Sequence, residues 1–210
     1  MAKKYQNHYQ NQMDFILDQT QELCIEKGIE NVSIVNIAKS CDITRATIYN
    51  YFRDKEDILW SIFFRHQTDM YEKCIAAINQ SHTTYEKMKS YAYTILSLYN
   101  ENVYYPVFME IFGSIYMQAS YKKDYNYKNP YNTHHIKPGD VVTLLAEHFH
   151  DGSVKADLDP KLATVSFIYG VSSLIDFLFK SKEAIAGKYQ LEFEMIAKTQ
   201  IEWLLNEIKA

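Results

Sequence analysis

Glycine and proline are scarce in this 210-residue sequence, which contains six Gly and four Pro. Sandwiches and barrels need such residues in many turns, so both are disfavoured, and long helices with short connections are favoured. Cysteine is scarce as well, with only Cys24, Cys41 and Cys74. Their number is odd, and their spacing matches neither a C-x-x-C motif nor a set of zinc ligands. This pattern indicates buried, reduced thiols, with a redox-sensing thiol as the alternative.

A basic excess and a long hydrophobic run are also absent. The net charge is −4, and residues 1–60 carry 7 Lys+Arg against 9 Asp+Glu. Within these sixty residues the balance reverses between Lys39 and Lys55, which carry a net charge of +2. The most apolar segment, Thr164–Phe179, is short for a bilayer crossing and contains Asp176. The first fifteen residues lack the apolar core of a signal peptide. We therefore expect a cytoplasmic protein without a membrane segment.

Apolar residues recur at helical spacing along nearly the whole chain. This pattern predicts an all-α fold of about nine helices. The first helix is expected to end at Lys27-Gly28, a basic last turn followed by glycine. Ser33 and Thr44 are expected to cap two short helices over 34–41 and 45–52, and Asp54 to open a long fourth helix.

Further helices are expected at about 84–100, 105–118, 139–150, 160–182 and 190–208. Ser120–Asp140, rich in Asn, Lys and Tyr, is expected to be a long surface loop. The chain is accordingly divided into a three-helix domain at 1–54 and a larger helical domain at 55–210.

The two short helices are joined by a tight turn, which predicts a helix-turn-helix whose second helix can enter a DNA major groove. Ile48 and Phe52 share one face of that second helix and are expected to be buried, with Ile43 filling the turn. Arg45 and Asn50 fall on the outer face, where they suit bidentate contacts to guanine and adenine, respectively.

Other residues around this face suit different contacts. Ala46 and Thr47 also face outward, and the small Ala46 allows the helix to approach the bases. Tyr49, Tyr51 and Lys55 suit phosphate contacts, which set register without reading sequence. Ser33 and Thr44 stand at helix N-termini, where backbone N–H groups favour a phosphate.

The segment CIEKGIENVSIVNIAKSCDITRATIYNYFRDKEDIL resembles the DNA-binding region of the tetracycline-repressor (TetR/AcrR) family. The matching positions are Gly28, Ile37-Ala38, Thr44, Tyr49, Tyr51-Phe52 and Lys55-Glu56. The resemblance implies DNA contacts at Ser33, Thr44, Arg45, Ala46, Thr47, Tyr49, Asn50, Tyr51 and Lys55.

Three positions depart from the family pattern. Asp42 stands where glycine is usual, although aspartate tolerates a left-handed turn. Val35 replaces a common basic residue, and the segment before the first helix offers only Lys3 and Lys4 to phosphate.

One helix-turn-helix covers little DNA, so two copies on an inverted repeat are expected. The last two helices carry apolar stripes that would form a four-helix bundle between subunits, as the family resemblance implies. The residues assigned to that interface are Phe167, Gly170, Val171, Leu174, Leu178, Ile196, Ala197, Ile201, Leu204 and Leu205. The alternative is that these stripes complete the core of a single chain.

The resemblance also implies an effector pocket enclosed by the middle helices. Aromatic side chains are abundant there and suit a flat apolar or cationic compound, with a carboxylate to neutralise positive charge. The candidate lining residues are Phe108, Glu110, Phe112, Tyr116, Met117, Phe149, Tyr169 and Asp176.

The resulting hypothesis is a homodimeric transcriptional regulator, a repressor released from a palindromic operator by a small molecule. The alternative keeps the helix-turn-helix but makes the large domain respond to a protein partner. No nucleophile elbow, phosphate-binding loop or zinc spacing is present in the sequence, so an enzyme, a cofactor and a metal site are not expected.

Overall fold

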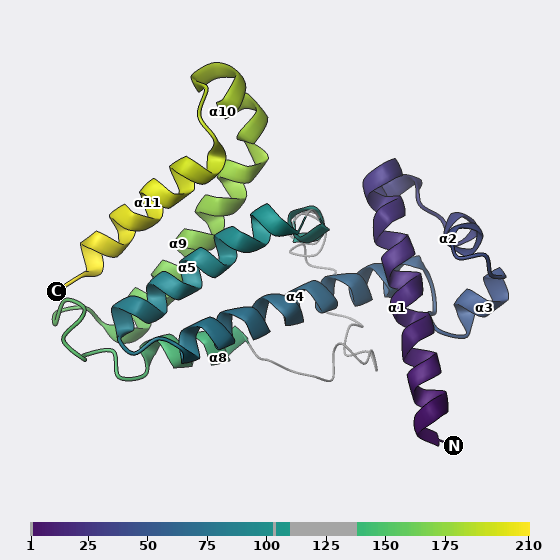
Figure 1. The fold of residues 1–210 in the computed structure, drawn as a ribbon, viewed down its shortest axis with the longest axis horizontal. Coiled ribbons are helices and arrows are strands. Elements are labelled where there is room, and N and C mark those ends of the chain that lie inside the picture. Colours follow the sequence, from purple (N-terminus) through teal and green to yellow (C-terminus); the bar gives the residue numbers. More distant parts are fainter. Residues whose placement is uncertain (1, 103, 110–137) are drawn as a thin grey trace. The chain divides into compact units, whose positions relative to one another are not determined.

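The computed structural model describes residues 2–102, 104–109 and 138–210 (Figure 1). The all-α prediction is confirmed, because these residues form nine α-helices, one 3-10 helix and a further helical segment at 104–109. The described residues divide into two compact units. The first contains those within Met1–His66 and Val107–Thr133, and the second those within Gln67–Pro106 and His134–Ala210. A domain boundary after residue 54 stays a prediction.

The first unit contains the three predicted N-terminal helices and the start of the fourth. Its elements are α1 (Ala2–Lys27), η1 (Ile29–Asn31), α2 (Ile34–Ser40), α3 (Arg45–Tyr49) and the beginning of α4 (Lys55–Asn79). Gly28 ends α1 with a φ of 78°, which glycine adopts without strain, and its N–H donates to the Cys24 carbonyl at 3.0 Å. α1 packs against η1 and α2, and α2 packs against α3.

The second unit is a layered helical bundle. Besides the end of α4, its helices are α5 (Thr84–Glu101), α8 (Pro138–Ala146), α9 (Pro160–Lys180), α10 (Lys182–Tyr189) and α11 (Phe193–Ile208). α5 contacts α8, α9 and α11, and α10 lies at the turn that joins α9 to α11 (Figure 1). Asp159 caps α9, with Pro160 as the first helical residue.

Two parts of the second half differ from the sequence prediction. α10 was not predicted, because Lys182–Tyr189 buries none of its side chains and so lacks an amphipathic stripe. It ends at Tyr189, and the next residue, Gln190, caps it with a left-handed φ of 55°. Most of the loop predicted at Ser120–Asp140 lies outside the described residues, which resume at Pro138. The last three residues of the predicted loop are instead the start of α8.

The interface residues predicted on the last two helices need a correction. Phe167, Val171, Leu178, Ala197, Ile201 and Leu205 are all buried within the second unit. The alternative, that these stripes complete the core of one chain, therefore holds for these six. Gly170 and Leu204 are exposed, and Leu174 and Ile196 are half-buried.

α9 is apolar on more than one side. Among the described helices it alone is long and apolar enough to cross a bilayer, judged by length and composition only. It packs here against α5, α8 and α11, and Leu162, Tyr169 and Phe177 remain exposed on it.

Candidate nucleic-acid interface

The turn between α2 and α3 is held by local hydrogen bonds that the sequence predicts. Ser33 and Asn36 form a reciprocal cap at the start of α2: the Ser33 Oγ accepts from the Asn36 N–H, and the Asn36 Oδ1 accepts from the Ser33 N–H. Asp42 takes the left-handed conformation expected of it, with a φ of 52°. The Thr44 Oγ1 then accepts from the Thr47 N–H at 3.1 Å and opens α3.

α3 has the two faces that a groove-binding helix requires. Ile48 and Phe52 are buried, as predicted, and Ile43 is half-buried at the turn. Arg45 and Asn50, the two residues assigned to base edges, are both exposed. The helix is thus anchored by a narrow apolar face while its polar face remains open to solvent.

The remaining assigned residues surround this polar face. Ala46 and Tyr49 are exposed, and Thr47 and Tyr51 are half-buried. α3 ends at Tyr49 rather than near Phe52, so Asn50 is its C-cap and Tyr51 lies in the following turn. The Ser33 and Thr44 hydroxyls are exposed but already accept hydrogen bonds as caps.

Lys55 has a structural contact that the sequence did not indicate. It is half-buried, and its Nζ donates to the backbone carbonyl of Ile29 in η1. An ammonium has three N–H donors, so this bond uses one and leaves two. Lys55 therefore ties the start of α4 to η1, whether or not it also contacts a phosphate.

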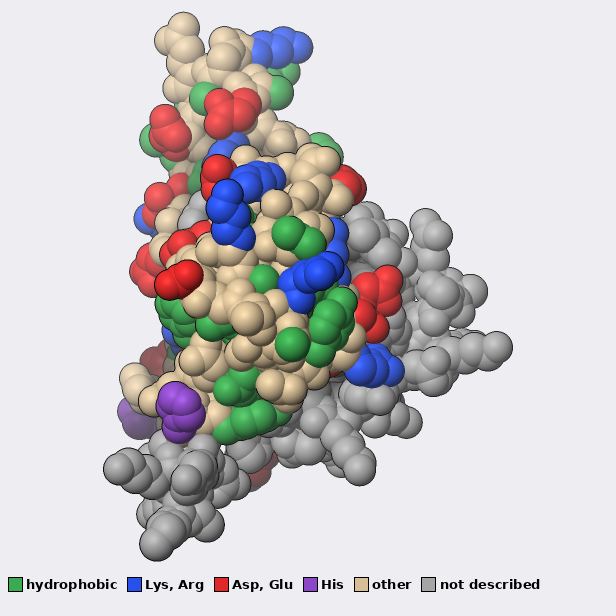
Figure 2. Space-filling view, turned by 90° about the vertical axis from the view of Figure 1, so that its right-hand side faces the viewer, with side chains coloured by type: hydrophobic (Ala, Val, Ile, Leu, Met, Phe, Trp, Pro, Cys, Tyr) green, Lys and Arg blue, Asp and Glu red, His purple; other side chains and the backbone are tan. Residues whose placement is uncertain are grey.

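The start of α4 is capped as predicted. The Asp54 Oδ1 accepts from the Asp57 N–H at 2.8 Å, and the Asp57 Oδ2 accepts from the Arg53 N–H at 2.9 Å. The side that carries α2 and α3 shows separate basic side chains among acidic, apolar and uncharged ones, not a continuous basic patch (Figure 2). Affinity for DNA at such a surface depends on shape and on a few charged contacts.

The three thiols are buried, which disfavours a redox role. Desolvation raises the pKa of Cys24 and of Cys41 to about 11 and that of Cys74 to about 12. A thiol with so high a pKa is almost wholly protonated at neutral pH, and the thiolate is the reactive form.

The structure describes four of the eight predicted effector residues, and the pocket that they would share stays a prediction. Glu110, Phe112, Tyr116 and Met117 lie outside the described part of the chain. Phe108 is buried in the first unit, with its ring 5.8 Å from that of His66, whereas Phe149 is buried in the second unit.

The last two effector candidates lie on α9. Tyr169 is 70% exposed, so its assignment to an enclosed pocket is wrong. Asp176 pairs with Lys180 at 2.8 Å and accepts a hydrogen bond from the Tyr99 hydroxyl at 3.3 Å. Its charge is therefore already balanced by a lysine on the same helix.

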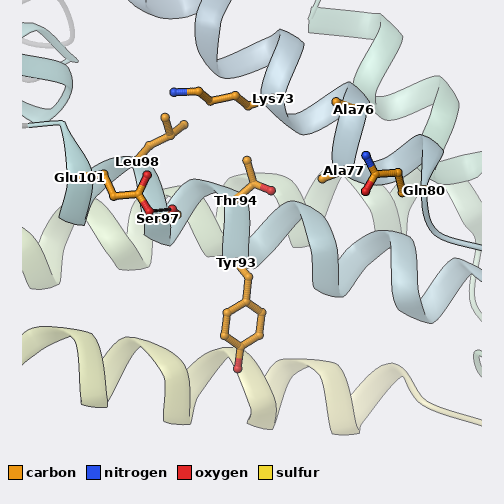
Figure 3. Close-up of a pocket in the computed structure, with 9 residues that line it drawn as sticks. All are labelled: Lys73, Ala76, Ala77, Gln80, Tyr93, Thr94, Ser97, Leu98 and Glu101. Carbon is orange, nitrogen blue, oxygen red and sulfur yellow. Dashed lines mark hydrogen bonds between the residues drawn. The ribbon is translucent and has the colours of Figure 1, made fainter.

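A groove does lie between α4 and α5 in the second unit, with a volume of about 480 Å³ (Figure 3). Its lining residues are Lys73, Ala76, Ala77, Gln80, Tyr93, Thr94, Ser97, Leu98 and Glu101. Tyr93 points away toward α11, where its hydroxyl donates to Glu202 at 2.7 Å. None of the four effector candidates that the structure describes lines this groove.

Comparison with known proteins gives one family. Residues 16–62 match the model of the bacterial regulatory proteins of the tetR family. The fatty acid metabolism regulator protein of Bacillus subtilis is 34% identical over 73 residues, which are 35% of this chain and 38% of that protein. The chain thus matches less than two-fifths of that relative's length.

Solved structures resemble the chain over almost its whole length. The regulator FadR from Bacillus subtilis in complex with stearoyl-CoA covers 92% of this chain, with 98% of its own length matched, a TM-score of 0.60 and 23% identity. AibR in complex with isovaleryl coenzyme A and operator DNA gives the same coverage and TM-score at 17% identity. At these identities the likeness is one of fold.

Proposed function

From the premise that this chain belongs, through its N-terminal domain, to the tetR family of bacterial regulatory proteins, we propose that it is a homodimeric DNA-binding transcriptional regulator. The observation that carries the proposal is the two-faced α3, with Ile48 buried beneath it and Arg45 and Asn50 exposed on it. A helix of this kind reads base edges in a major groove while its apolar face fixes its orientation.

The second copy is proposed to dock on the outer faces of α9 and α11. Leu162, Tyr169 and Phe177 are exposed on α9 at helical spacing, and Met195 and Trp203 are exposed on α11. Gly170 and Ser173, which are also exposed, allow close approach along the same part of α9. Exposed aromatic groups in this number are typical of an interface, and a two-fold dimer uses one self-complementary face.

The dimer would place two copies of α3 on one duplex. The two helix-turn-helix domains of the dimer would bind half-sites about 34–36 Å apart, and their binding free energies would roughly add. A single domain of this size does not supply enough binding free energy by itself. A palindromic operator is the sequence that such a dimer recognises. Loss of the dimer should therefore also weaken DNA binding.

A small molecule is proposed to release the DNA, which makes the protein a repressor. It can do so only if it binds the released geometry more tightly than the DNA-bound one. Acyl coenzyme A thioesters are the first compounds to test, because two structures of similar fold hold such ligands. Flat organic cations are the second class, because the second unit is rich in tyrosine.

The test is DNA binding by fluorescence anisotropy, with the duplex upstream of the protein's own gene and with unrelated DNA of equal length. Arg45→Ala and Asn50→Ala should each weaken specific binding about 5- to 150-fold, the range for one bidentate base contact. Lys188→Ala removes an exposed basic side chain from α10, which belongs to neither proposed surface, and serves as the matched control. Equal affinity of the wild type for both DNAs, or unchanged affinity in both α3 variants, would refute the proposal.

The effector is tested by adding each compound to the preformed complex. Release by a coenzyme A thioester or by an organic cation supports the small-molecule form. If neither class of compound releases the DNA but a co-purifying protein does, the large domain responds to a protein partner and the small-molecule proposal is wrong.

A further inference from the structure

Tyr9 lies against a residue assigned to the DNA surface. It is on α1, and its ring centroid is 4.7 Å from that of Tyr51, with the two ring planes tilted by 34°. The two residues are far apart in sequence, so only the folded first unit brings them together. Tyr9 remains 45% exposed, so the pair forms at the surface and not in the core.

Tyr51 lies beyond the end of α3, so the helix does not restrict its side chain. Its N–H donates to the Ile48 carbonyl at 3.0 Å, which fixes its backbone, but its side chain leaves the helix and is only half-buried. A half-exposed tyrosine in a turn samples several rotamers, and ordering it on DNA costs conformational entropy. A ring packed against it in the free protein lowers that cost.

The Tyr9 phenol is partly desolvated beside Tyr51. Desolvation, then Tyr51, then Asp57 raise the pKa of the Tyr9 phenol. Asp57 is itself held as part of the cap of α4, where it accepts from the Arg53 N–H. The Tyr9 ring therefore packs against the turn after α3, which leads into α4.

We propose that Tyr9 is a positioning residue for DNA binding, whose ring holds the Tyr51 side chain ready to meet a phosphate of the duplex. The inference rests on the proposed function and extends the DNA surface from α2 and α3 to α1. Because the contact is with the backbone, it contributes to affinity without reading sequence.

The ring, and not the hydroxyl, of Tyr9 carries the effect. Tyr9→Phe keeps the pair of packed rings and should bind DNA within about twofold of the wild type. Tyr9→Ala removes the pair and should weaken binding about three- to tenfold, in line with the usual strength of aromatic pairs. The loss should be the same for specific and unrelated DNA, since no base is read.

The experiment is a double-mutant cycle with Tyr9→Ala and Tyr51→Ala, measured by fluorescence anisotropy on the two DNAs. In the Tyr51→Ala background, Tyr9→Ala should change the dissociation constant by less than about twofold, because its partner is gone. Phe15→Ala, which removes another exposed aromatic ring from α1, is the matched control and should leave binding unchanged. Thermal unfolding of each variant identifies any general loss of structure.

Binding by Tyr9→Ala within twofold of the wild type overturns the inference. So does an equal loss in the presence and absence of Tyr51, since Tyr9 would then act by another route. In both cases the proposed function survives if Arg45→Ala still weakens specific binding. If the wild type binds no DNA, the proposed function and this inference fail together.

Discussion

The dimer surface can be tested most directly at Trp203 on α11. Its side chain is 64% exposed in the single chain. A buried aromatic side chain covers about 150–250 Å², so the exposed part corresponds to about 100–160 Å². At about 25 cal/mol per Å², burying that area contributes about 2.5–4 kcal/mol per copy. We therefore expect Trp203→Ala to weaken the dimer.

Two-fold symmetry doubles the effect, because each substitution occurs in both subunits. The sum, about 5–8 kcal/mol, is an upper bound, because part of the ring stays exposed in any interface and area converts poorly into affinity. A weakening of the dimer by at least about a hundredfold is the conservative expectation. The fold should survive, since the replaced side chain is mostly outside the core.

Sedimentation velocity over a concentration series measures the dimer dissociation constant. Tyr49→Ala, at an exposed aromatic residue on α3, is the control that should keep the dimer but weaken DNA binding. A wild type that is monomeric at micromolar concentration refutes the surface, as does a Trp203→Ala protein with an unchanged dissociation constant.

The remaining predictions concern stability and reactivity. Ile48→Ala should destabilise the first unit by about 2–5 kcal/mol, because Ile48 is fully buried under α3, and chemical denaturation will measure this. Cys24, Cys41 and Cys74 should react with a thiol reagent only when the protein unfolds, because burial raises the pKa of each to about 11 or 12; a spectrophotometric thiol assay will show it. Desolvation acts to raise the pKa of Asp151, but hydrogen bonds from Ser153 and Thr84 outweigh it and lower the pKa to about 2. The Asp151 carboxylate should therefore stabilise the fold above about pH 4 and lose that contribution as pH falls toward 2, a dependence that Asp151→Asn should lack in thermal unfolding scans.

Each of these has a result that contradicts it. Ile48→Ala with wild-type stability would mean that α3 is not anchored by its apolar face. Fast modification of the native thiols would restore the redox alternative. Equal pH profiles for wild type and Asp151→Asn would show that the bonds at the start of α5 do not hold in solution.

Local chemistry made much of the first unit predictable. Gly28 ends α1, Ser33 and Thr44 cap α2 and α3, and Asp42 takes the left-handed turn, each through contacts within a few residues along the chain. The burial of Ile48 beneath α3 follows from helical periodicity for the same reason. These features need no knowledge of the rest of the molecule.

The sequence did not predict the packing of α9 and α11 correctly, because apolar periodicity does not show which surface an apolar helix face packs against. α9 is apolar on two sides, and the sequence could not tell that Phe167 and Val171 pack inward while Tyr169 and Phe177 face out. Tyr169 was assigned to a pocket for the same reason. The effector residues between 110 and 137 stay predictions.

The amino-acid sequence by itself determined where α1 ends, where α2 and α3 begin and which face of α3 is apolar, since caps, turns and periodicity act over a few residues. Only the tertiary structure decided which stripe of α9 meets α5, that Lys55 reaches Ile29, and that the Tyr9 ring packs against Tyr51. Such contacts join residues distant in sequence, and their geometry exists only once the helices have packed.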